Sequence, residues 1–142
     1  ANTENIKSYF FNKNEFEVLA QQILIKENIE IICLAGFMQI LSKNFLQNWI
    51  NRIINIHPSY LPHFKGLNAQ EQAIKAKATY SGCTVHYVNH EIDGGEIILQ
   101  KKVNLSENED IESLSKKILK EEHIIYPKAL KIVVNKILKN NI

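Results

Sequence analysis

The stretch NRIINIHPSYLP, residues 51–62, decides how the rest of the sequence is interpreted. The apolar run 53–56 contains one polar residue, Asn55, and it is followed directly by His57 and Pro58. Residues two apart on a strand point to the same side, so Asn55 and His57 share one face. A buried amide without a partner costs about 1–3 kcal/mol. The pattern therefore predicts a strand whose carboxyl end presents an amide and an imidazole to one common space.

Helical and strand-like segments alternate outward from this stretch. Short apolar runs predict buried strands, and apolar residues three and four apart predict helices. Strands are predicted at 29–37, 52–57, 82–88 and 95–105, and helices at 12–28, after Ser42, at 68–78 and from Asp110 onward. This order predicts a single α/β domain over residues 1–142, with a mostly parallel sheet, flanking helices and an antiparallel edge. Ligands of such sheets bind beyond the carboxyl ends of the strands.

Local signals refine the expected ends of the helices. Asn12 with Glu15, and Asn68 with Glu71, form the N-x-x-E pattern that predicts capping boxes. Pro127 is expected to kink or restart the last helix, because proline lacks the amide hydrogen.

The composition excludes several classes of protein. The net charge of +2 is too small to indicate nucleic-acid binding. No apolar run approaches the roughly 18–20 residues that a membrane span needs, and the first residues do not resemble a signal peptide. The two cysteines, Cys33 and Cys83, lack C-x-x-C partners, so we expect two buried free thiols in a reducing cytoplasm.

A third polar group, Asp93, lies in the turn sequence HEIDGG. An amide, an imidazole and a carboxylate together suit acyl transfer, because an amide and an imidazolium can donate to a developing oxyanion and a carboxylate can accept a proton. His86 is either a further polar wall of the same pocket or a core histidine. Ser59 and Ser81 have no base beside them in the pattern, which favours direct transfer between two substrates over a covalent intermediate. The spacing of the five histidines does not indicate a metal site.

Four segments carry a resemblance to a known family: AGFMQILS (35–42), NIHPSYLPHFKGLNAQEQAI (55–74), GCTVHYVNHEIDGGEIILQ (82–100) and EEHIIYP (121–127). They resemble the folate-dependent formyltransferases, and within them phosphoribosylglycinamide formyltransferase of purine synthesis. The resemblance implies a metal-independent transfer of a formyl group from 10-formyltetrahydrofolate to the amine of glycinamide ribonucleotide. The expected partners are these small molecules, with no nucleic acid and no membrane, and the expected assembly is a monomer or a homodimer.

The same resemblance assigns roles to individual residues. Asn55 is expected to hold the formyl oxygen, His57 to stabilise the oxyanion as imidazolium, and Asp93 to orient His57 and remove the amine proton through water. The residues expected to bind the folate are Met38, Gln39, Ile40, Leu41, Leu46, Ile53, Val88, Asn89, His90, Glu91 and Ile92. Those expected to bind the ribonucleotide are Pro58, His86 and Glu122. The peptide bond before Pro62 is expected to be cis.

The sequence departs from the family pattern in two places. Gln39 stands where the family commonly has an arginine near the glutamyl end of the folate. The family's first strands and its Gly-rich phosphate loop have no counterpart here, so we expect a domain without its N-terminal strands. The alternatives that stay open are a formyltetrahydrofolate hydrolase, a folate-binding fragment without catalysis and, last, an initiator-tRNA formyltransferase.

Overall fold

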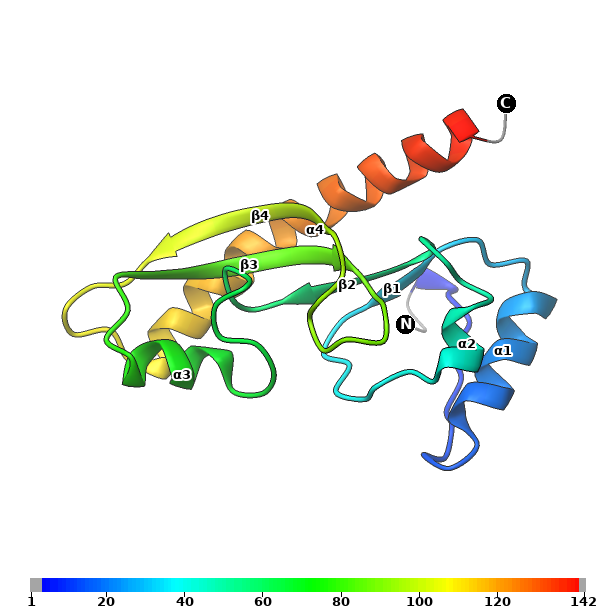
Figure 1. Ribbon diagram of the computed structural model, residues 1–142, viewed down its shortest axis with the longest axis horizontal. Helices are drawn as coiled ribbons and strands as arrows, with labels where there is room; N and C mark the ends of the chain where they lie inside the picture. The colour runs from blue at the N-terminus through cyan, green and yellow to red at the C-terminus, as the bar shows by residue number, and fades with distance from the viewer. Residues whose placement is uncertain (1–3, 141–142) are drawn as a thin grey trace.

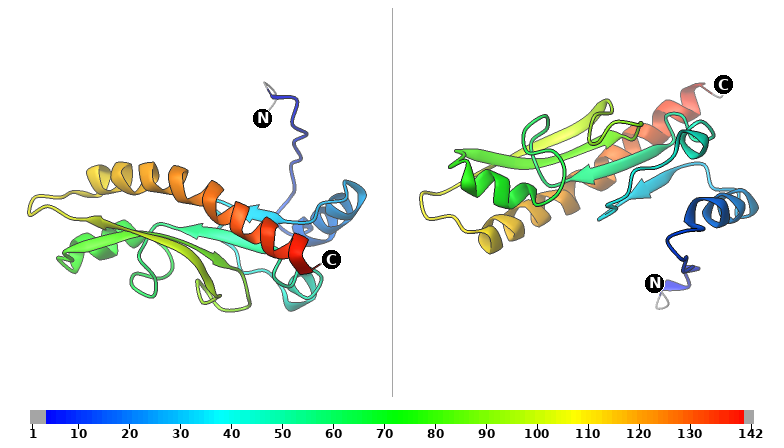
Figure 2. Two further views of the ribbon diagram at one scale, coloured as in Figure 1. Left: turned by 90° about the horizontal axis from the view of Figure 1, so that it is seen from above. Right: turned by 60° about the horizontal axis from the view of Figure 1, so that its bottom comes forward.

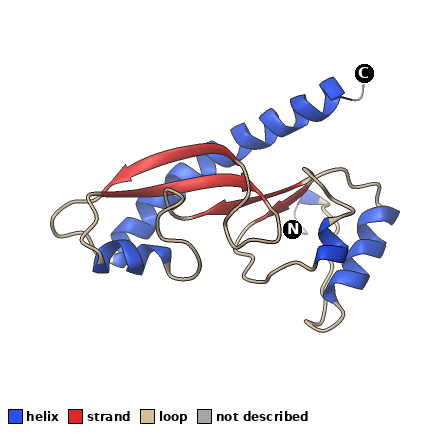
Figure 3. Ribbon diagram, in the orientation of Figure 1, coloured by secondary structure: helices blue, strands red, loops and turns tan. Residues whose placement is uncertain are grey.

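The computed structural model describes residues 4–140 and confirms the α/β class. Figure 1 labels the elements and Figure 3 separates helices from strands. The helices are α1 (Phe16–Lys26), α2 (Lys43–Leu46), α3 (Ala69–Lys75) and α4 (Ile111–Asn140). The strands are β1 (Ile32–Leu34), β2 (Ile53–His57), β3 (Tyr80–Tyr87) and β4 (Ile97–Asn104). Each predicted segment thus contains the expected kind of element.

The four strands form one mixed sheet in the order β1-β2-β3-β4. Only β1 and β2 are parallel, whereas β2–β3 and β3–β4 are antiparallel. The prediction of a mostly parallel sheet is therefore wrong for these strands. Parallel neighbours need a crossover of about a dozen residues or more, and antiparallel neighbours can be joined by a shorter connection such as residues 88–96 between β3 and β4.

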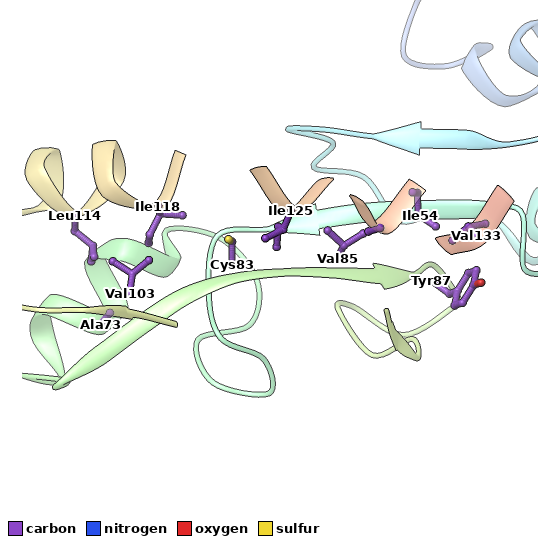
Figure 4. Close-up of a cluster of buried hydrophobic side chains, with 11 residues drawn as sticks. Ile54, Ala73, Cys83, Val85, Tyr87, Val103, Leu114, Ile118, Ile125 and Val133 are labelled. Carbon is purple, nitrogen blue, oxygen red and sulfur yellow. The ribbon is translucent and has the colours of Figure 1, made fainter. Parts of the chain in front are cut away.

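The long helix α4 covers one face of the sheet, as the views in Figure 2 show, and it contacts β2, β3, β4 and α3. Its buried residues follow the helical spacing that the sequence shows. They pack against the side chains of β2 and β3 that point to this face, forming the cluster drawn in Figure 4. Those of α4 are Leu114, Ile118, Ile125, Ala129 and Val133. Ile111, at the start of the same helix, is 47% exposed and does not join this cluster.

Pro127 does not restart the helix, because α4 continues from Ile111 to Asn140. The residue lies on the exposed side of the helix. Proline has no amide hydrogen, so the carbonyl four residues earlier loses its helical partner. On the exposed side of a helix water can bind that carbonyl, so the helix can continue through the proline.

A second, smaller core joins α1 and α2 to the start of β2. Its buried members are Ala20, Leu41, Phe45, Trp49 and Ile53. The Trp49 indole donates to the side-chain oxygen of Gln21 at 2.7 Å, which ties the segment after α2 to α1. This core holds the loop after β1 in place beside the sheet.

The helix caps agree with the sequence in part. Ser42 caps α2 as predicted, because its hydroxyl accepts from the Phe45 amide at 3.1 Å. The two predicted capping boxes are wrong. The N-cap of α1 is Glu15, which makes no side-chain cap, and Asn68 caps α3 in the left-handed conformation without a side-chain hydrogen bond.

The two cysteines differ in their environments. Cys83 is fully buried as predicted, and this burial raises the pKa of its thiol to about 12. Cys33 is exposed, contrary to the prediction, because it lies on the edge strand β1. Within residues 4–140, no helix is both long and apolar enough to cross a membrane.

Candidate active site

Polar side chains from β2 and β3 meet on one face of the sheet. In the antiparallel register Asn55 lies opposite His86, and His57 lies opposite Thr84. Directly opposed residues in such a pair share a face, so these four side chains are neighbours. Ile54 points to the other face, where it belongs to the core under α4. The alternation of apolar and polar residues along β2 thus separates the core from the site.

The helix α4 fixes the end of β1 next to this polar face. The Tyr126 hydroxyl donates to the carbonyl of Leu34, the last residue of β1, at 2.6 Å. Leu34 pairs with Asn55 in the parallel register. Burial raises the pKa of Tyr126, so its hydroxyl keeps the proton that it donates.

The turn after β3 brings Asp93 to the same place. Asp93 has a positive φ of 50°, a conformation that aspartate adopts more readily than most residues. Gly95 lies so close to β3 that an added Cβ would stand 1.7 Å from the Tyr87 carbonyl oxygen. The carboxylate is held by the Gly66 amide, which donates to Oδ2 at 2.9 Å. The D-G-G turn therefore places the Asp93 carboxylate beside β3, and it is more than an exposed surface turn.

The Asp93 carboxylate lies between two imidazoles. Oδ2 is 3.5 Å from Nδ1 of His57, and Oδ1 is 3.7 Å from Nε2 of His86. The side chains of all three residues are largely buried, with exposed fractions of 8%, 11% and 3% for His57, Asp93 and His86. Charges interact strongly in such a water-poor place.

The His57 ring is flanked by two acceptors. Nε2 lies 2.9 Å from the carbonyl oxygen of Phe64, and since a carbonyl only accepts, Nε2 is the donor. Nδ1 then faces the Asp93 carboxylate, which also only accepts when ionised. The surroundings therefore suit an imidazolium with a proton on each nitrogen. A direct hydrogen bond from His57 to a substrate oxygen requires exchange of one of these contacts.

Two buried polar atoms in the site lack a partner within the described chain, namely Oδ1 of Asn55 and Nε2 of His86. Nδ1 of His86 donates to the Tyr87 carbonyl at 2.8 Å, so in the neutral ring Nε2 carries a lone pair. Burial lowers the pKa of His86, which favours that neutral form. Buried polar atoms are normally satisfied, and unsatisfied ones beside a cavity indicate a place for a ligand.

These groups open into a cavity of about 770 Å³. All three residues predicted to be catalytic, Asn55, His57 and Asp93, line it, as do all three predicted to bind the ribonucleotide, Pro58, His86 and Glu122. Of the predicted folate residues, the cavity lining includes Met38, Gln39, Ile40, Leu41, Val88, Asn89, Glu91 and Ile92. As expected, the cavity lies beyond the carboxyl ends of the parallel strands β1 and β2.

Three predicted folate residues do not line the cavity. Ile53 is a core residue with 1% exposure, and Leu46 packs against the same core. His90 is exposed on the turn after β3. Ile53 and Leu46 support the cavity wall from behind, so a direct contact of either with a ligand is not favoured by this geometry.

Several residues that line the cavity were missed by the sequence analysis. One group lies on α4 at positions 115, 118 and 119, which with the predicted Glu122 follow the i, i+3, i+4, i+7 spacing of one helix face. This spacing, once Glu122 is placed in the site, could have found Ser115 and Leu119. The other groups lie at 34–37, the end of β1 and the loop after it, and at 66–70, the loop before α3 and its first residues.

Glu122 has an unusual environment for a helical glutamate. It is half-buried and lines the cavity, and burial raises the pKa of its carboxyl. Its raised pKa marks it as a functional-site candidate, because buried carboxylates without a cation are costly for stability. Within residues 4–140 there is no group of three or more His, Cys, Asp or Glu side chains placed to hold a metal ion.

Residues 2–130 match the sequence profile of the formyl transferase family. The chain belongs to the formyl transferase family. Among the relatives, it is 42% identical over 125 residues to the phosphoribosylglycinamide formyltransferase of Bacillus subtilis. It is 46% identical over 126 residues to the trifunctional purine biosynthetic protein adenosine-3 of Chironomus tentans.

A solved structure supports the family's fold for this chain. The phosphoribosylglycinamide formyltransferase of Anaplasma phagocytophilum superposes with a TM-score of 0.89 at 43% identity, covering 95% of this chain and 67% of that one. The two sequence matches cover 88% and 89% of this formyl transferase chain. The chain spans 64% of the Bacillus subtilis protein's length and 9% of the trifunctional protein's.

Proposed function

We propose that this chain carries the chemistry of phosphoribosylglycinamide formyltransferase. It would transfer the formyl group of 10-formyltetrahydrofolate to the amine of glycinamide ribonucleotide, in purine biosynthesis. The observation that carries the proposal is the convergence of Asn55, His57 and Asp93 in one cavity beyond the ends of β1 and β2. The similarity to phosphoribosylglycinamide formyltransferases over most of the chain supports it.

Asn55 is the proposed ligand of the formyl oxygen. Its side chain lines the cavity, and the contact to the formyl oxygen is assigned to the Nδ2 amide group, because Oδ1 can only accept. When an amine attacks a formyl carbon, the carbonyl oxygen gains negative charge, and an amide N–H that is already in place stabilises it.

His57 and Asp93 supply the charge and the proton acceptor. A protonated His57 places positive charge beside the developing oxyanion, and Asp93 keeps the ring in that orientation. The attacking amine must lose one proton when the new C–N bond forms, and the Asp93 carboxylate is the base proposed to receive it through water. When the tetrahedral intermediate collapses, the bond from the formyl carbon to the folate nitrogen breaks, and that nitrogen takes up a proton.

Apolar side chains of the cavity lining suit the flat faces of a folate ring system, whose edge carries polar groups. Met38, Ile40 and Ile92 are exposed by 74%, 67% and 57%, although each lines the cavity. Apolar side chains at a concave rim, with a few polar groups inside, are typical of small-molecule sites. In the proposal these residues hold the ring, while Gln39 lies toward the glutamyl end.

Three other lining residues, Glu122, Pro58 and His86, are assigned to the ribonucleotide. A carboxylate suits the hydroxyl groups of a ribose because it accepts hydrogen bonds. The proposal further includes direct transfer without a metal, action in the cytoplasm, and a monomer or homodimer.

The test follows loss of the formyl group from 10-formyltetrahydrofolate by absorbance, with and without glycinamide ribonucleotide. Loss only in the presence of the ribonucleotide is the expected result. Loss without any acceptor would instead favour a hydrolase. Folate binding without loss in either condition would contradict transfer by this chain and favour a binding fragment.

A further inference from the structure

We infer that Gln100, on β4, is a positioning residue for His57, acting through the loop between β2 and α3. This inference rests on the proposed function for its catalytic meaning, and its structural part can be tested independently. Gln100 does not line the cavity, so it is not a catalytic residue. Its contacts nevertheless reach the backbone that supports the His57 ring.

The Gln100 side chain holds two neighbouring acceptors at once. Its Nε2 donates to the Leu61 carbonyl at 2.7 Å and to Oγ1 of Thr84 at 3.1 Å. Gln100 pairs with Thr84 in the antiparallel register, so the two side chains share a face. His57 lies on the same face, because it pairs with Thr84 from the neighbouring strand β2.

Thr84 extends the contact into the loop. Its hydroxyl donates to the Ser59 carbonyl at 2.8 Å and accepts from the Leu61 amide at 3.1 Å. The Ser59 hydroxyl in turn donates to the His63 carbonyl at 2.6 Å. Thr84 and Ser59 have no exposed surface, so these bonds are made without competition from water.

The held segment leads directly to the His57 contact. Residues 59–63 are fixed by the polar network, and the next residue, Phe64, gives its carbonyl to Nε2 of His57 at 2.9 Å. The Leu61–Pro62 peptide lies within this segment and is cis, as predicted. Loss of the Gln100 contacts would therefore move the Phe64 carbonyl relative to the imidazole.

The far side of the loop is held by another glutamine. Nε2 of Gln72 donates to the carbonyls of Lys65 and Leu67, at 2.9 and 2.8 Å. Phe64 thus lies between a part of the loop held from β4 and a part held from α3. The Gln72 hydrogen bonds remain in a Gln100 variant. We therefore expect a local shift of Phe64 and not a change in the conformation of the whole loop.

The test replaces Gln100 by methionine, which has a similar length but no donor, in the full chain. The readout is the pair of ring 15N and N–H proton shifts of His57, assigned by comparison with His57→Asn. These shifts report the hydrogen bond at Nε2 in either protonation state. We expect them to change in Gln100→Met, and to stay at their wild-type values in the control Lys101→Met, whose exposed side chain points to the opposite face.

Gln100→Asn provides a second variant, because it retains the donor on a shorter side chain that cannot reach both acceptors. It decides the question if the methionine variant does not fold. Unchanged His57 shifts in a folded Gln100 variant would overturn the inference, even if its melting temperature fell.

Activity gives the catalytic readout. We expect kcat to fall by about 10- to 100-fold, with KM for the folate near the wild-type value, since a small displacement of a catalytic group affects chemistry more than binding. A rise in KM of similar size with kcat unchanged would contradict positioning of His57. If the wild-type chain transfers no formyl group while the His57 shifts still respond, the proposed function fails and the structural inference stands.

Discussion

Nδ1 of His57 lies 3.5 Å from Oδ2 of Asp93, although the two residues come from different elements of the sheet face. His57 ends β2, whereas Asp93 lies in the turn after β3. The antiparallel pairing of β2 with β3 brings them together, and the Gly66 amide fixes the carboxylate. The pair therefore depends on the strand order as much as on the two residues.

Asp93→Asn is expected to lower kcat by about 10²- to 10⁴-fold, because it removes the charge that faces His57 and the proposed proton acceptor. The amide is nearly isosteric, so the chain should still fold, although loss of the buried charge beside His57 should lower the melting temperature. The measurement is formyl transfer with both substrates. Asp110→Asn is the matched control, since Asp110 lies at the start of α4, where asparagine also caps helices. Near-wild-type transfer by Asp93→Asn would remove Asp93 from the mechanism.

Gly95→Ala should destabilise the chain and disturb the site together. The added Cβ would stand 1.7 Å from the Tyr87 carbonyl oxygen, and backbone cannot yield at such a distance. Overpacking of this kind costs about 1–3 kcal/mol or more.

Gly94→Ala is the matched control for that change. Its Cβ would meet the side chain of Glu91, at 2.6 Å from a carboxylate oxygen and 2.7 Å from Cβ, but no backbone atom at such a distance. We therefore expect Gly94→Ala to cost stability too, but less than Gly95→Ala. Urea unfolding of both variants compares the two free energies. An equal loss in both would mean that the close approach at Gly95 has no special cost.

The strand that carries Asn55 and His57 could be predicted from sequence, because period-two alternation within an apolar run has one structural meaning. The cavity contains all the predicted catalytic residues for the same reason. Leu46 and Ile53 were placed in the folate site by resemblance alone, and the structure puts them in or against the core. Apolar residue type does not distinguish a cavity wall from the layer behind it.

Long-range contacts account for most of what the sequence left out. The direction of β3 relative to β2 depends on how the connection through α3 returns, which no local pattern fixes. The capping patterns at Asn12 and Asn68 were overridden because the chain enters α1 and α3 in other backbone conformations. No sequence pattern indicated a role for Gln100, because its partners Leu61 and Thr84 are distant in sequence.

Glu122→Gln is expected to raise the melting temperature near neutral pH. Burial raises the pKa of Glu122 above 4.5, so its contribution to stability is complete below that pH and is lost as the pH rises through the folded-state pKa. The amide removes the cost of the buried charge, and the gain should vanish below pH 4.5. Melting curves near neutral pH and below pH 4.5 test this, with Glu121→Gln as the neighbouring control outside the cavity lining. A gain that is equal at both pH values would contradict the argument.

The same linkage predicts the opposite sign for His86. Burial lowers its pKa below 6.5, with smaller contributions in the same direction from His57 and Lys65. The hydrogen bond to the Tyr87 carbonyl and the charge of Asp93 oppose this shift. A group with a lowered folded-state pKa stabilises the fold fully above the unfolded value, and this contribution is lost as the pH falls through the folded-state pKa.

The free energy of unfolding should therefore decrease as the pH falls below about 6.5, and this decrease should be smaller in His86→Gln, which cannot take up the proton. Urea unfolding across that range measures both slopes. His123→Gln serves as the control, because His123 is exposed on α4 and its replacement should leave the wild-type slope. If His86→Gln retained the full slope and His123→Gln lost it, the acid sensitivity would lie on the surface of α4, and the neutral, buried imidazole beside Asp93 would not be its source.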